Sequence, residues 1–212
     1  MPVRYKWVVC FLAMLLLFNG CVPAGPAQPT GDSGPDGSLN CLEISRFSGG
    51  FVEDGSDAPV RDVAAILVVN NTGKFLELAT VTYKVGDRTA TFKVTGLPQG
   101  KRAWVLESNR MTLTDGDELV LEDCRETYHS NPVLSTDALA VSRRGQALTL
   151  TNTSGRKLTN VTVYYKNTLE DGTYMGGISY LISFGEMEPG VSVTRTADHF
   201  NDTSEIVRYS FQ

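Results

Sequence analysis

The stretch ILVVNNTGKFLELATVTYK, at residues 66–84, decides the fold, because a closely similar stretch, LTLTNTSGRKLTNVTVYYK, follows at residues 148–166. At a constant offset of 82 residues the identical positions are Asn70 and Asn152, Gly73 and Gly155, Leu76 and Leu158, Thr80-Val81 and Thr162-Val163, and Tyr83-Lys84 and Tyr165-Lys166. Self-similarity at a fixed spacing is the signature of a repeated structural unit. The sequence therefore predicts two copies of one domain, at residues 39–127 and 133–212.

Each copy has the pattern of an all-β domain. Ala79, Val81 and Tyr83 alternate with polar residues, as expected for a strand with one buried face. β-branched and aromatic residues are abundant, turn residues recur every 8–12 positions, and no stretch after residue 38 has a helical period. We expect two tandem β-sandwiches of the immunoglobulin or fibronectin type.

The N-terminus predicts export from the cytoplasm. Arg4 and Lys6 precede twelve apolar residues at 7–18, which are too few to span a bilayer that needs about 20. A basic start, a short apolar segment and a small residue before the cleavage site are typical of a secretory signal peptide, here residues 1–20.

Gly20 directly before Cys21 resembles the lipobox of bacterial lipoproteins. The resemblance implies that Cys21 is acylated, becomes the first residue, and anchors the protein on the extracytoplasmic face of the cell membrane. The alternative is plain secretion with cleavage nearby. Eight of the seventeen residues at 22–38 are Gly or Pro, so residues 21–38 are expected to form the lipidated Cys and a tether.

The charge and composition of the chain limit the classes of partner that it can bind. The 212 residues carry a net charge of −5 and include no basic block, which argues against a nucleic-acid partner. Membrane contact is therefore expected through the acyl chains alone. His129 and His199 are the only histidines, and both are expected to be exposed polar residues.

Cys41 and Cys124 remain as an even pair in an exported protein, so a disulfide between them is predicted. Closing that loop would stabilise the first domain by roughly 4–5 kcal/mol in the chain-entropy model. The alternative is two reduced, buried thiols. No CxxC motif or Cys/His cluster indicates a zinc site.

Within the second copy, residues 146–195 resemble the FxLYD-type and related immunoglobulin-like modules of bacterial surface lipoproteins. The shared positions are Asn152, Thr153, Ser154, Gly155, Leu158, Asn160-Val161, Tyr165, Asn167 and Pro189-Gly190. This resemblance implies an extracellular, non-catalytic module.

Catalytic and metal-binding motifs are scarce. Ser154 and Lys157 formally match an SxxK pair, but they fall on an expected turn rather than on the helix which that motif requires. The acidic loops at 53–57 and 115–118 could offer oxygens to Ca²⁺, yet they lack the EF-hand spacing and are expected to be solvated turns. We expect no catalytic residue, no metal and no cofactor.

The best candidate for a ligand surface comes from comparing the copies. The second copy has eight extra residues around 170–177, which carry Tyr174. Alternation directs Tyr180, Ile182 and Phe184 inward. It leaves Tyr164, Tyr174 and Leu181 as an exposed apolar platform, suited to stacking on a sugar or to a protein contact. The alternative is that this face packs against the first domain or is simply exposed.

Together these observations predict a lipid-anchored extracytoplasmic protein that acts as a non-catalytic binding or structural module. Its partner would be an unidentified protein or a cell-wall glycan. One alternative is a carbohydrate or cell-wall binder that uses Tyr164 and Tyr174. A second is an enzyme with an unrecognised site.

Overall fold

The computed structural model describes residues 38–50 and 59–212, and these residues form strands without a helix. The all-β fold class is thereby confirmed. The strands are β1 (Leu39–Gly50), β2 (Pro59–Asn70), β3 (Phe75–Val85), β4 (Arg88–Leu97), β5 (Arg102–Leu106), β6 (Val120–His129), β7 (Leu139–Arg144), β8 (Ala147–Asn152), β9 (Leu158–Thr168), β10 (Tyr174–Met187), β11 (Ser192–Thr196) and β12 (Ser204–Ser210).

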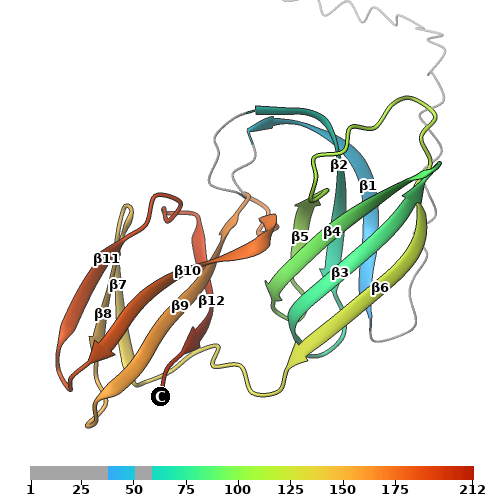
Figure 1. Ribbon diagram of the computed structural model, residues 1–212. Helices are drawn as coiled ribbons and strands as arrows, with labels where there is room; N and C mark the ends of the chain where they lie inside the picture. Colours follow the sequence, from blue (N-terminus) through green and yellow to red (C-terminus); the bar gives the residue numbers. More distant parts are fainter. Residues whose placement is uncertain (1–37, 51–58) are drawn as a thin grey trace, which may run out of the picture.

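The strands form two sandwich-like lobes that lie side by side (Figure 1). In the first lobe, β1, β2 and β5 face a sheet of order β4-β3-β6. In the second lobe, β10, β9 and β12 face a sheet of order β11-β8-β7. Each pair of sheets encloses its own apolar core. The domain boundaries at 39–127 and 133–212, and the equivalence of the lobes as tandem repeats, stay predictions.

The predicted alternation of buried and more exposed side chains holds within the first matched stretch, residues 66–84. Ala79, Val81 and Tyr83 are at most 4% exposed and pack in the first core, whereas Lys84 is exposed. The Tyr83 ring meets Phe92 of the neighbouring strand edge to face, with centroids 5.8 Å apart. In the second lobe Tyr165 is 1% exposed, as its match to Tyr83 predicts.

The two matched asparagines are fully buried and make the same hydrogen bonds. Asn70 Nδ2 donates to the carbonyls of Lys74 and Leu97, and its Oδ1 accepts from the backbone N–H of Thr72. Asn152 Nδ2 donates in the same way to the carbonyls of Arg156 and Met187, and its Oδ1 accepts from the backbone N–H of Ser154. Each amide thus closes the turn that follows its strand and joins it to the facing sheet.

A single sheet runs through both lobes, with the order β1-β2-β5-β10-β9-β12. The link is a short parallel pairing in which Ala103 lies opposite Tyr174 and Trp104 opposite Met175. The start of β10 therefore extends the sheet of the first lobe, while the rest of β10 belongs to the second (Figure 1).

Four predicted features lie outside the described residues: the signal peptide at 1–20, the lipidation site Cys21, the tether as far as residue 37, and the acidic loop 53–57. Within residues 38–50 and 59–212 there is no helix of the length and apolarity needed to cross a membrane.

Candidate functional site

Tyr174 is not on the surface, which corrects the predicted platform. Its side chain is 0% exposed and belongs to the apolar core of the first lobe. The ammonium groups of Lys101 and Lys166 lie 5.4 and 5.9 Å from its ring centroid. Burial, followed by the nearby Glu205 carboxylate, raises the pKa of the Tyr174 phenol.

Tyr164 is also unavailable for stacking. It is half-buried against the core of the first lobe, and the Arg208 guanidinium covers its ring at 4.1 Å from the centroid. Of the three predicted platform residues, only Leu181 is exposed, at 59%. The structure therefore matches the alternative that this face packs against the first lobe.

Polar contacts also join the two lobes around Tyr174, and we call this contact between the lobes the junction. The backbone N–H of Ser179 donates to Thr95 Oγ1 at 2.7 Å, and Ser179 Oγ donates to the Thr95 carbonyl at 2.9 Å. Gly96 fits beside Ser179, since an added Cβ would lie 2.4 Å from Ser179 Oγ. Two ion pairs lie at its border, Lys101 with Glu205 at 2.9 Å and Arg102 with Asp171 at 3.1 Å.

Lys166 is a buried charged residue that the sequence did not reveal. Its match in the first copy, Lys84, is exposed, whereas Lys166 is 1% exposed. Its Nζ donates to the carbonyls of Gly176 and Gly177 at 3.2 and 2.7 Å. These two glycines lie in the insertion of the second copy, so the insertion is the only sequence signal that sets Lys166 apart from Lys84.

The predicted disulfide is absent, because Cys41 and Cys124 are both free thiols. Their sulfur atoms contact different acceptors: Cys41 Sγ lies 3.5 Å from the Glu43 carbonyl, and Cys124 Sγ lies 3.4 Å from Glu126 Oε1. Burial and then the Glu126 carboxylate raise the pKa of Cys124 to about 12, and burial raises that of Cys41. Both thiols are therefore poor nucleophiles at neutral pH.

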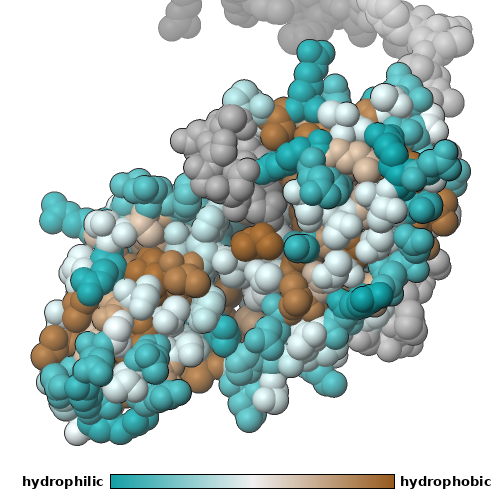
Figure 2. Space-filling model, in the orientation of Figure 1, coloured by the Kyte–Doolittle hydropathy of each residue, from teal (hydrophilic) through white to brown (hydrophobic). Residues whose placement is uncertain are grey.

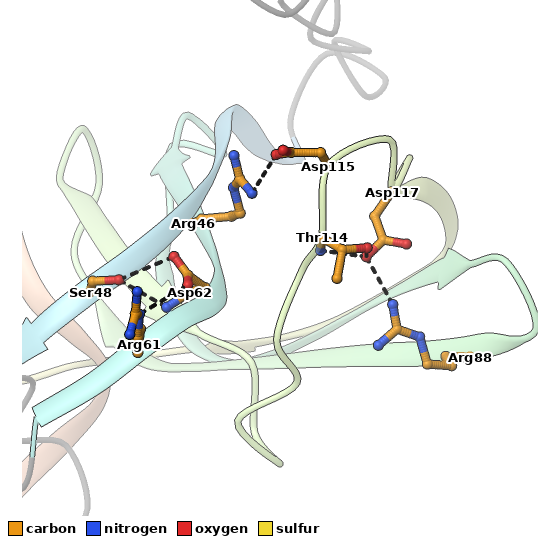
Figure 3. Close-up of polar contacts among 8 residues, drawn as sticks. All are labelled: Arg46, Ser48, Arg61, Asp62, Arg88, Thr114, Asp115 and Asp117. Atoms are coloured by element: carbon orange, nitrogen blue, oxygen red, sulfur yellow. Dashed lines mark hydrogen bonds and ion pairs between the residues drawn. The ribbon is translucent and has the colours of Figure 1, made fainter.

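The acidic loop at 115–118 is held by cations of the chain itself (Figure 3). Asp117 Oδ2 accepts from the Thr114 backbone N–H at 2.7 Å and pairs with Arg88 at 3.0 Å. These contacts, the Thr114 N–H foremost, lower the pKa of Asp117. Asp115 pairs with Arg46 at 2.7 Å.

A second polar cluster in Figure 3 joins β1 to β2. Ser48 Oγ accepts from the Asp62 backbone N–H at 2.9 Å, and the Asp62 carboxylate lies 3.5 Å from Arg61. Across residues 38–50 and 59–212, no three His, Cys, Asp or Glu side chains gather as they would around a metal ion.

The formal SxxK pair is not assembled for catalysis. Ser154 Oγ lies 2.6 Å from Asn152 Oδ1, within the buried turn network. Lys157 Nζ contacts Glu186 and Glu188 at 2.6 and 3.2 Å, and these bonds raise its pKa, which keeps it protonated. A protonated lysine cannot act as the general base that such a serine needs.

Both histidines are half-buried, which differs from the expected exposed positions. The ring of His199 stacks on Tyr180 with centroids 5.1 Å apart. The ring of His129 lies edge-on to Phe75 at 6.5 Å, and its Nδ1 accepts from the Asn131 N–H at 3.2 Å. Each imidazole packs on an aromatic neighbour, which accounts for the partial burial.

Apolar side chains on the surface are dispersed. Figure 2 shows mainly hydrophilic residues on one face of the molecule, with the hydrophobic ones in separate patches. The exposed large apolar residues come from many elements: Leu42, Leu78, Val120, Leu121, Leu134, Val141, Leu169, Leu181 and Val191.

The chain matches no protein-family model, and no curated protein is similar to it in sequence.

Proposed function

We propose that the protein is a lipid-anchored extracytoplasmic module with a non-catalytic binding or structural role. The anchor rests on the signal-peptide pattern and on Gly20-Cys21. Three observations support a non-catalytic role: Lys157 is paired with Glu186, the thiol of Cys124 has a raised pKa, and the loop carboxylate of Asp117 is paired with Arg88.

The observation that carries the structural part of the proposal is the junction. A continuous sheet, a fully buried Tyr174 and two hydrogen bonds between Thr95 and Ser179 hold the lobes together. Two domains joined in this way keep a fixed orientation, unlike domains linked only by a flexible segment. Such a module would hold the second lobe at a set distance beyond the first, which receives the tether at Leu39.

The anchor is tested by Cys21→Ser in cells that export the protein. The variant lacks the thiol that would be acylated, so we expect it to leave the membrane fraction and become soluble without detergent. Cys10→Ser is the matched control, because Cys10 lies in the apolar segment of the signal peptide. Detergent-dependent retention of Cys21→Ser would contradict the proposal.

A further inference from the structure

A third apolar cluster lies on the outer face of the sheet that joins the lobes, outside both cores. Its buried members are Val63, Ala65 and Leu106, each at most 2% exposed, and its partly buried members are Phe47, Val60, Trp104 and Met175. We call this group the outer cluster. The outer face of a sandwich sheet is ordinarily polar because it meets water, so an apolar group there marks a contact.

Met175 belongs to the outer cluster but comes from β10, a strand of the second lobe. It lies opposite Trp104 in the parallel pairing of β10 with β5, and Trp104 lies opposite Leu67 of β2. Leu67, Trp104 and Met175 therefore form one row across three strands, with their side chains on the same face. The parallel pairing consists of two residue pairs, so Met175 supplies one of the two β10 residues that extend the sheet of the first lobe.

The matched row of the second lobe has hydroxyl groups instead. Leu67 matches Thr149 at the offset of 82 residues, and Thr149 lies opposite Thr194 of the neighbouring strand β11. The two threonine hydroxyls are hydrogen-bonded to each other at 2.8 Å. Within the described residues β11 ends its sheet, whereas β5 is followed by β10. The apolar row thus occurs in the lobe that receives a strand from the other lobe, which indicates that it serves the junction.

The Met175 side chain is partly exposed although it packs on the outer cluster. Met187, by contrast, is 1% exposed and packs in the core of the second lobe. Met111, the remaining methionine of the described residues, is partly buried against the core of the first lobe. Small oxidants react with a thioether that they can reach. Met175 therefore combines an accessible sulfur with a place in the pairing that joins the lobes.

We propose that Met175 is a site of reversible oxidation by peroxides and that its oxidation loosens the junction. One oxygen of hydrogen peroxide is transferred to the sulfur, the O–O bond breaks, and the second oxygen leaves as water with both protons. The thioether is oxidised by two electrons to a sulfoxide, and the peroxide is reduced. Methionine sulfoxide reductases reverse this reaction.

The polarity of the sulfoxide explains why the junction loosens. A sulfoxide oxygen accepts hydrogen bonds, and burying it in an apolar row without a donor costs free energy. The oxidised side chain is therefore expected to turn toward water and to leave its place beside Trp104. The inference rests on the fixed orientation of the lobes under the proposed function, and it does not depend on the lipid anchor.

Peptide mass spectrometry measures the oxidation after the purified full chain is treated with dilute hydrogen peroxide. We expect Met175 to be oxidised at least about tenfold faster than Met187 in the folded chain, because Met187 is buried. In urea the two methionines should react at similar rates, since both are then exposed. Similar rates in the folded chain would overturn the inference.

Calorimetry of the same samples measures the effect on the junction. We expect peroxide to lower the melting temperature by about 2–4 °C and methionine sulfoxide reductase to restore it. Met175→Leu keeps an apolar side chain of similar volume without the sulfur, so its melting temperature should not respond to peroxide. Met111→Leu is the matched control, because it keeps Met175 and should respond as the parent chain does.

The other outcomes also decide the question. A melting temperature that is unchanged after complete oxidation of Met175 would overturn the inference, as would an equal response of Met175→Leu and the parent chain. If Met175→Leu does not fold, M111L/M187L provides the same test, because Met175 is then the one methionine after residue 20. Two separate unfolding transitions before any peroxide is added would instead contradict the fixed orientation of the lobes, so the two proposals can fail separately.

Discussion

At the residue scale, the buried asparagines show how one amide can organise a loop. Asn152 satisfies the carbonyls of Arg156 and Met187 with two donors that no apolar residue could supply. The same role explains why Asn70 lies at the equivalent point of the first matched stretch. A buried carbonyl without a donor is costly, so these positions tolerate little change.

Asn152→Ala should lower the free energy of unfolding by about 2–4 kcal/mol, because it removes the hydrogen bonds of a buried amide to the Met187 and Arg156 carbonyls and from the Ser154 backbone N–H. Urea titration measures the change. Asn71→Ala is the control, because Asn71 is exposed, and we expect a change within about 0.5 kcal/mol. Equal effects of the two substitutions would show that the buried network contributes nothing specific.

The thiol of Cys124 gives a prediction in pH. Its pKa is raised from 9.0 to about 12, so near pH 9 the folded chain keeps the thiol protonated while an unfolded chain has ionised about half of it. Alkylation of Cys124 at pH 9 should therefore be more than about tenfold slower in the folded chain than in urea. Mass spectrometry of the alkylated peptides measures both rates, and similar rates would contradict the raised pKa.

The raised pKa of Cys124 also makes the stability of the fold depend on pH. A thiol whose pKa is higher in the folded state destabilises the fold as pH rises, because ionisation favours the unfolded chain first. The contribution of the protonated Cys124 thiol to the free energy of unfolding is fully present below about pH 9 and is lost between pH 9 and about 12. Reductant, by contrast, should leave the unfolding transition unchanged, since Cys41 and Cys124 are free.

At the element scale, β10 contains both residues whose burial the sequence predicts and a residue whose burial it does not. Alternation correctly directs Ile182 and Phe184 inward and Leu181 outward, because this part of the strand pairs regularly with β9. Between Met175 and Tyr180 the register shifts, and the strand before the shift pairs with β5 of the other lobe. Alternation states which residues share a face but not which strand will cover it, so the burial of Tyr174 could not be predicted.

Gly96 tests the contact between β4 and β10. Gly96→Ala places a Cβ 2.4 Å from Ser179 Oγ, so it should disturb the hydrogen bonds between Ser179 and Thr95. Gly86→Ala is a close control, because both glycines have φ of +57° but nothing lies within 4 Å of the Cβ at Gly86. We expect Gly96→Ala to lower the melting temperature more, by the equivalent of about 1–3 kcal/mol. Equal melting temperatures of the two variants would mean that both are destabilised only by backbone strain, and that the contact with Ser179 contributes nothing.

At the scale of the whole molecule, the two lobes share core as well as sheet. Tyr174 and Val207 of the second lobe belong to the apolar core of the first. A repeat in the sequence predicts two similar domains, but it contains no information on how those domains dock. That information lies in the residues by which the copies differ, such as the insertion that carries Tyr174.

The shared core predicts that the full chain unfolds in one cooperative transition by calorimetry. Tyr174→Ala should lower the stability by about 3–5 kcal/mol, because it empties a fully buried site, and it should split the transition into two. Leu181→Ala, on the same strand but 59% exposed, should change the stability by about 0.5 kcal/mol or less. Two separate transitions in the unaltered chain would show that the lobes are thermodynamically independent.

The parallel pairing of β5 with β10 also matters while the chain is being synthesised. The first lobe is complete in sequence before β10 exists, and until then β5 presents an unpaired edge to other chains. Exposed strand edges are sites of aggregation, particularly while a chain is still folding. Because β10 covers this edge of β5, a chain truncated before Tyr174 should aggregate more readily than the full chain.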